Sequence, residues 1–372
     1  MIHPWTTSLV GTWLLAVSTS APLAAAEPLR PTRLRCEYLE NPLGIEDTAP
    51  RLSWQVTSAE RGQRQTAYRI LVASHPEKLA ASEGDLWDSG EVASDQTVNV
   101  VYAGKPLTSR ATCHWKVQVW DKAGEPGAWS QPAHWSMGLL QPADWQAQWI
   151  SFKDTSPLHT DRKSLFLPAA RHYRKEFATE KTVRRATIYA SALGLFELHL
   201  NGRRVGDDYF TPGWSDYLKR AYYRTYDVTP LLSPGANALG AVVAEGWYAG
   251  YVGYGLLVGY GPNKVGRYFY GKSPALLAQL EIEYTDGSRT ILGTDTSWQV
   301  SADGPLREAD LIMGERFEAG RDDPDWCRRG PSRPNGPLAP WKWEPAIRAE
   351  DNGSTKAVFF DNCGSREVEL GF

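Results

Sequence analysis

Short runs of alternating apolar and polar residues fill the first third of the chain, from about residue 33 to residue 138. They are separated by turn-forming residues and read RLSWQV, AYRILVA, LWDSGEV, TVNVVY, CHWKVQVWD and AWSQPAHWSMG. In HWKVQVWD, a period of two puts Trp115, Val117 and Val119 on one face, which we expect to meet a core. Several short strands with turn signals between them are typical of a β-sandwich. We therefore expect one over residues 33–138.

A second β-patterned region follows a Pro- and Gly-containing change of pattern near residues 139–146. Its runs include HYRKEFA, RRATIYASALGLFELHLNG, AYYRTYDVT, NALGAVVAEGWY and PALLAQLEIEYTDGSRTILGT. In LEIEYTDGSRTILG, Asp286 and Gly287 separate two alternating runs, which predicts a hairpin. Long amphipathic helices are hard to find, so we expect a second β domain over residues 145–346 and an irregular tail over 347–372.

The first 26 residues have the pattern of an export signal. Residues 9–17 form an apolar run that is too short to cross a bilayer, and the small residues 24–26 fit a cleavage site. No later segment has the length and hydropathy of a membrane helix. We expect residues 1–26 to be removed and the protein to be exported to the periplasm or the extracellular space.

Composition changes the picture in two ways. A formal net charge of -3 provides no basic field for a nucleic-acid backbone, so we expect no nucleic-acid partner. The 16 Trp and 17 Tyr combine flat apolar faces with polar edges. Such side chains stack on sugar rings and also fill the ends of β-sandwiches, so composition leaves both uses open.

The four cysteines are too sparse and too widely spaced for a disulfide scaffold, and no Cys-x-x-Cys pair suggests zinc. Cys36 and Cys113 could form a disulfide within one domain in an oxidising compartment. Buried thiols are an equal alternative.

Motifs for catalysis are missing. Hydrolysis of a glycosidic bond generally needs two carboxyl groups about 5–9 Å apart, and no stretch joins acidic residues to a barrel or a deep cleft. There is no Gly-x-Ser-x-Gly and no Cys and His arrangement of known form. Oxygen ligands of the kind that bind Ca2+ do gather in HLNGRRVGDDYFTPGWSDY, where Asn201-Gly202 also predicts a type I′ turn.

Several long stretches together resemble bacterial α-L-rhamnosidases. RCEYLENPLGIEDTAPRLSWQV, AYRILVASHPEKL and HWKVQVWDKAGEPGAWSQPAHWSMGLL are similar to the N-terminal fibronectin-type domain of these enzymes. ALGLFELHLNGRRVGDDYFTPGWSDYLKRAYYRTYDVT, EGWYAG and MGERFEAGRDDPDW resemble their next domain, a jelly roll related to rhamnose-binding modules. The resemblance covers about residues 33–346 and implies an all-β fold, a fibronectin-type β-sandwich followed by a jelly-roll β-sandwich.

The resemblance also implies a ligand. The jelly roll of some relatives binds L-rhamnose through a calcium ion, so we expect a rhamnose-containing glycan as partner and Ca2+ as cofactor. The expected residues are Trp214 and Trp247 for ring stacking, Asp216 and Glu315 for sugar hydroxyls or calcium, and Asn201 as turn or ligand. The alternative is a structural or adhesion-like sandwich protein without a sugar site.

No catalytic residue is expected within this sequence. The resemblance assigns hydrolysis of terminal α-L-rhamnose to two glutamates in a large (α/α)6 barrel, which would begin after residue 346. We therefore expect the purified chain to release no rhamnose from an aryl rhamnoside on its own. Release above the buffer blank, followed in a colorimetric assay, would contradict this expectation.

Overall fold

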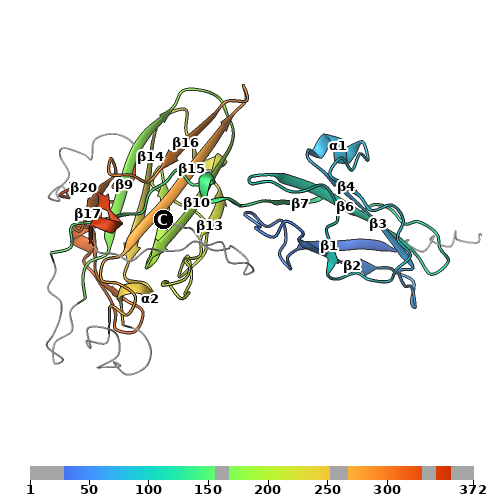
Figure 1. The fold of residues 1–372 in the computed structure, drawn as a ribbon, viewed down its shortest axis with the longest axis horizontal. Helices are drawn as coiled ribbons and strands as arrows, with labels where there is room; N and C mark the ends of the chain where they lie inside the picture. The colour runs from blue at the N-terminus through green and yellow to red at the C-terminus, as the bar shows by residue number, and fades with distance from the viewer. Residues whose placement is uncertain (1–28, 156–166, 252–266, 329–340, 353–372) are drawn as a thin grey trace, which may run out of the picture.

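The structure is a computed structural model that describes residues 29–155, 167–251, 267–328 and 341–352. Two β-sandwiches lie next to each other along the long axis of the molecule (Figure 1). The described helices are short: α1 (Pro76–Ala80), α2 (Gly246–Ala249) and the 3-10 turns η1 (Pro142–Asp144), η2 (Thr229–Leu231), η3 (Ala319–Arg321) and η4 (Ala349–Asn352). None of them has the length and apolar character to cross a membrane. The predicted all-β fold is confirmed, while the expected signal residues 1–26 lie outside the described residues.

The first sandwich pairs a three-stranded sheet with a four-stranded one, all antiparallel. The sheets are β1 (Arg30–Cys36), β2 (Arg51–Thr57) and β5 (Val100–Val101), and β4 (Trp87–Asp88), β3 (Ala67–Ala73), β6 (Thr112–Trp120) and β7 (Ala133–Ser136), in these spatial orders. Strands β4 and β5 pair over only two residues each. Gly90 and Asn99, next to them, have positive φ, which takes the backbone out of the extended conformation.

The core of this sandwich confirms the predicted face of β6. Trp115, Val117 and Val119 are fully buried, and the Trp115 indole meets Trp135 of β7 edge to face, with ring centroids 6.2 Å apart. On the opposite face, the ammonium of Lys116 lies 4.8 Å from the centre of the Trp129 ring.

Cys36 and Cys113 both belong to this core and are present as thiols, not as a disulfide. Burial raises the pKa of the Cys113 thiol to about 12, so the group stays protonated and unreactive near neutral pH. Cys327 is likewise a buried thiol in the second sandwich, and Cys363 lies outside the described residues.

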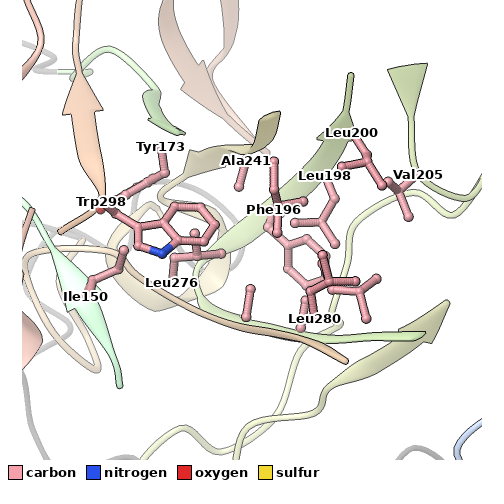
Figure 2. Packing of buried hydrophobic residues seen from close by; sticks show 14 of the residues in the cluster. Ile150, Tyr173, Phe196, Leu198, Leu200, Val205, Ala241, Leu276, Leu280 and Trp298 are labelled. Carbon is pink, nitrogen blue, oxygen red and sulfur yellow. The ribbon is translucent and has the colours of Figure 1, made fainter. Parts of the chain in front are cut away.

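The second sandwich has two six-stranded sheets. The first runs β13 (Arg224–Asp227), β10 (Val183–Leu193), β15 (Ala275–Tyr284), β8 (Ile150–Ser151) and β21 (Ile347–Arg348), with β16 (Arg289–Gly293) also paired to β15. The second runs β12 (Arg203–Arg204), β11 (Leu195–Leu200), β14 (Gly235–Ala244), β9 (Arg171–Thr179), β17 (Gln299–Ser301) and β20 (Glu344–Pro345). A separate hairpin joins β18 (Leu306–Asp310) and β19 (Gly314–Phe317). Phe196, Leu280 and Trp298 are among the side chains that fill the core between the sheets (Figure 2).

Gly194 divides one apolar run of the sequence between the two sheets. Strand β10 ends at Leu193 in the first sheet, and β11 begins at Leu195 in the second. Gly194 has a φ of 131°, and a Cβ at this position would come within 2.3 Å of the Ala244 carbonyl oxygen. A residue without a side chain is therefore required where the chain crosses from one sheet to the other.

The predicted hairpin at Asp286-Gly287 is confirmed. It joins the antiparallel strands β15 and β16, and Gly287 takes the positive φ of 82° that the turn requires. The Asp286 carboxylate accepts a hydrogen bond from the Ser288 amide at 2.9 Å.

A polar junction joins the two sandwiches. Arg110, in the loop before β6, donates from Nε and Nη2 to the two carboxylate oxygens of Glu281 on β15, at 2.7 and 2.8 Å. The same guanidinium binds the carboxylate of Asp144, in the connecting turn η1, at 2.5 Å. Glu281 is almost completely buried, and Gln279 donates a further hydrogen bond to it at 2.8 Å. Arg110 thus links the first sandwich, the connection and the second sandwich through one side chain.

Apolar packing completes the junction. Tyr223 is buried, and its hydroxyl accepts a hydrogen bond from the Leu139 amide at 3.2 Å. Its ring meets Trp145 edge to face with centroids 5.4 Å apart. A Cβ on Gly138 would come within 2.2 Å of the Tyr223 hydroxyl, so the connection can pass this point only with glycine.

We predict that Arg110→Ala lowers the free energy of unfolding by about 3 kcal/mol, because it leaves the buried Glu281 carboxylate without its main counter-charge. The matched control is Arg69→Ala, which removes the exposed pair with Asp88 and should cost less than about 1 kcal/mol. Urea denaturation of both variants measures the difference. Equal stabilities would show that the junction contributes no more than a surface ion pair.

The same junction should respond to acid. Burial alone would raise the pKa of Asp144, but hydrogen bonds from Ser109 and Arg110 outweigh burial, so its pKa lies below the ordinary value of 3.8. The stabilisation from this carboxylate is therefore complete above that ordinary value and lost as the pH falls through the lowered one. The stability difference between wild type and Arg110→Ala should accordingly shrink at such acidic pH.

Candidate functional site

The loop between β12 and β13 carries two of the five residues expected to bind a ligand, Trp214 and Asp216. Its first part is tied to the second sheet, because the Phe196 amide donates to the Thr211 carbonyl at 2.9 Å and the Thr211 hydroxyl donates back to Phe196. Further along, Ser215 and Tyr217 face inward, and the Tyr217 hydroxyl donates to the Gly213 carbonyl at 3.2 Å. With its neighbours turned into the protein, Trp214 is left on the surface.

Trp214 and Trp247 lie against each other on this surface. Their rings are parallel to within 5°, with centroids 6.0 Å apart, although the residues belong to a loop and to helix α2. Phe210 adds a third ring, 6.3 Å from Trp247. Trp214 is 52% exposed and Phe210 is 61% exposed. We call these three residues the aromatic surface, and it is the candidate site for a ligand.

A buried ion pair fixes the helix that carries Trp247. Glu245, directly before α2, pairs with Arg267, and both side chains are almost completely buried. The guanidinium lies 4.4 Å from the centre of the Tyr268 ring, and its Nε donates to the Ala249 carbonyl at 3.4 Å. Arg267 therefore contacts both ends of α2 and holds the helix in place.

The electrostatics of this pair follow from its burial. Burial raises the pKa of Glu245, against the opposing effect of the Arg267 charge. Asp310 contributes a second negative charge that also raises the pKa of Glu245, while its own carboxylate accepts the Tyr251 amide at 2.9 Å. These groups are occupied in supporting the backbone beneath the aromatic surface.

Asp216 lies two residues after Trp214 and is half-exposed. One carboxylate oxygen accepts the Leu218 amide at 3.2 Å, which makes Asp216 the cap of a turn, and the other lies 3.7 Å from the Lys219 ammonium. The side chain is 45% exposed, so part of the carboxylate faces solvent.

Asn201 is a turn residue. Its φ is 54° and that of Gly202 is 76°, the positive pair of a type I′ turn between β11 and β12. The side-chain amide donates to Asn237 at 2.7 Å and to the Leu231 carbonyl at 3.0 Å, and its oxygen accepts the Ala238 amide at 2.9 Å. Asn201 was expected to be either a turn residue or a ligand. These bonds hold it as a turn residue.

Glu315 lies on β19 in the exposed hairpin, opposite Ala309 of β18. In the part of the chain that the structure describes, no hydrogen bond or ion pair joins Glu315 to Asp216, and no three His, Cys, Asp or Glu side chains are grouped so as to hold a metal ion. Among the described residues, the structure thus joins the two expected ligand carboxylates by no bond, and Asp216 is the one close to Trp214 in sequence.

Two features of the site were not predicted from the sequence. Phe210 lies in HLNGRRVGDDYFTPGWSDY between charged residues and a proline. This position could have been used to predict an exposed aromatic residue. The Glu245–Arg267 pair had a weaker signal in the sequence, because only Glu245, the acidic residue after the apolar run of β14, pointed to it. Its partner is 22 positions away in sequence, and only the fold brings the two together.

Comparison with known proteins gives two family matches. Residues 31–141 match the Rha78A-like N-terminal immunoglobulin domain, and residues 181–342 match the α-L-rhamnosidase N-terminal domain. An immunoglobulin domain and a fibronectin-type domain share the sandwich architecture, so the first match agrees with the predicted fold.

Curated relatives and solved structures agree with these matches. An α-L-rhamnosidase of Alteromonas sp. (strain LOR) is 38% identical over 85% of this chain and 33% of its own length. One of Streptomyces avermitilis is 32% identical over 81% of this chain and 44% of its own length. The crystal structure of Streptomyces avermitilis α-L-rhamnosidase complexed with L-rhamnose superposes with a TM-score of 0.74 at 30% identity, covering 87% of this chain and 45% of that one. The chain therefore spans less than half the length of these relatives.

Proposed function

The chain belongs to the α-L-rhamnosidase family through its two N-terminal domains, and we propose that its second sandwich binds the rhamnose of a glycan at the aromatic surface. The observation that carries the proposal is the parallel Trp214–Trp247 pair, with Trp214 half-exposed. An indole face stacks on the apolar face of a sugar ring, while nearby polar groups bind its hydroxyls.

The geometry of the pair assigns a different role to each indole. A sugar between the two rings would need about 7–8 Å between their planes, twice the usual contact distance of about 3.5–4.0 Å. Centroids 6.0 Å apart leave no such space. We infer that the sugar stacks on the outer face of Trp214, that Trp247 supports Trp214 from behind, and that Asp216 accepts hydrogen bonds from sugar hydroxyls.

The comparisons support rhamnose as the sugar. The relatives are α-L-rhamnosidases, and one solved structure was determined with L-rhamnose bound. In this proposal the two sandwiches are the N-terminal region of an enzyme that removes α-L-rhamnose from glycans. They hold a rhamnose-bearing glycan, while the Arg110 junction keeps the second sandwich, with its aromatic surface, in a defined orientation relative to the first.

We predict that Trp214→Ala weakens binding of L-rhamnose or a rhamnosyl oligosaccharide at least about tenfold, because the variant removes most of the apolar contact with the ring. Titration calorimetry with the whole chain measures the change. The control is Tyr38→Ala in the first sandwich, which truncates an aromatic residue of almost the same exposure, 53% against 52%.

The control variant should bind like the wild type. If wild-type protein binds no rhamnosyl glycan, in the calorimeter or on a glycan array, the sugar-binding proposal is wrong and a structural or adhesion-like role is favoured. If Trp214→Ala binds normally, the sugar lies elsewhere.

Calcium belongs to the same proposal. We propose that Asp216 supplies a carboxylate oxygen to Ca2+ and that sugar hydroxyls and water molecules complete its shell of six to eight oxygen ligands. Rhamnose affinity should then fall when the protein is treated with EGTA and return when Ca2+ is added. Asp216→Asn should weaken the response to Ca2+. The same affinity with and without EGTA would exclude a calcium-linked site.

A further inference from the structure

A polar cleft of about 440 Å3 opens between the two sandwiches beside the Arg110 junction. The first sandwich contributes Ser109 and Arg110 to its lining, and the second contributes Arg184, Arg185 and Arg289. The volume lies within the range of small-ligand pockets, about 300–1,000 Å3. The cleft belongs to neither domain alone and is separate from the aromatic surface.

Four guanidinium groups share three carboxylates here. Glu283 pairs with both Arg184 and Arg185, and Glu281 pairs with both Arg110 and Arg289. The third carboxylate, that of Asp144, binds Arg110. Positive charge therefore exceeds negative charge at the cleft, in a chain whose formal net charge is -3.

The backbone places two consecutive arginines on one carboxylate. Neighbouring residues of a regular strand point to opposite faces. The pairing of β10 with β15 shifts register between Val183 and Arg185, and both Arg184 and Arg185 reach Glu283. Bulges that redirect a side chain in this way are common next to binding sites.

Two of the arginines retain donors for a ligand. Arg289 is 42% exposed, and its contact with Glu281 is long, 3.5 Å. Arg184 is 58% exposed and contacts Glu283 through Nη2. A guanidinium has five N–H donors in a fixed fork that suits carboxylate and sulfate oxygens, and bonds of this kind are charge-assisted.

We propose that this cleft binds an oxyanion carried by a sugar, either a uronate carboxylate or a sulfate ester, through Arg184 and Arg289. The anion adds the negative charge that the four arginines lack. That the carrier is a sugar rests on the proposed function; the anion site itself does not.

The test uses calorimetry of the whole chain at constant ionic strength with four probes: D-glucuronate, D-glucose 6-sulfate, D-glucose and inorganic sulfate. The proposal expects binding of glucuronate or of glucose 6-sulfate, and comparison of the two identifies the anionic group. It expects no binding of glucose. Binding of inorganic sulfate alone would overturn the proposal in favour of a free-anion site, and no binding of any probe would overturn it altogether.

The variant Arg184→Ala/Arg289→Ala should weaken the bound acidic probe at least about tenfold, since each lost charge-assisted bond contributes that much or more. Both side chains are exposed, so the fold should survive, and thermal denaturation checks this. The control is Arg316→Ala, a guanidinium 53% exposed that also pairs with two carboxylates, on the β18–β19 hairpin.

Wild-type affinity in the double variant would overturn the proposal, as would an equal loss in Arg316→Ala. The two binding proposals can therefore be refuted independently of each other. Trp214→Ala should leave the acidic probe bound, and the double arginine variant should leave rhamnose bound.

Discussion

The contact between Arg110 and Glu281 is the interaction on which the arrangement of the two sandwiches depends. The two residues are 171 positions apart, and one guanidinium satisfies a carboxylate that is almost completely buried. Such a pair contributes little if both partners are replaced together by apolar groups, but loss of one partner leaves a buried charge. The junction therefore selects one relative orientation of the domains, and Tyr223 and Trp145 fill the space beside it.

The aromatic surface depends on a second buried pair. Arg267 binds Glu245 before α2 and the Ala249 carbonyl at its end, so the short helix is held at both sides. Four residues of helix have little stability of their own, because a helix nucleus is costly to form. The parallel position of Trp247 against Trp214 is thus imposed by the surrounding chain, and such preorganisation would favour the proposed sugar binding.

The two proposed sites would recognise different properties of one glycan. The aromatic surface is suited to the apolar face of a neutral sugar, whereas the arginine-lined cleft is suited to an oxyanion. Both depend on buried ion pairs that fix backbone or domain positions, so the recognition surfaces would need little reorganisation on binding.

The sequence by itself determined the elements and the two sandwiches. The period-two pattern of Trp115, Val117 and Val119 and the turn at Asp286-Gly287 depend only on near neighbours, so they are predictable from local order. Trp214 and Trp247 were expected for ring stacking from the family resemblance, and the fold places the two rings together.

Only the tertiary structure decided how distant residues combine. It split one apolar run at Gly194 between two sheets, and it assigned Asn201 to a turn network. It placed Glu315 on a hairpin with no bond to Asp216, and it paired Arg110 with Glu281. These outcomes depend on which chain segments become neighbours in space. Hydrophobic periodicity reports which face of a strand is buried, but not what lies opposite it.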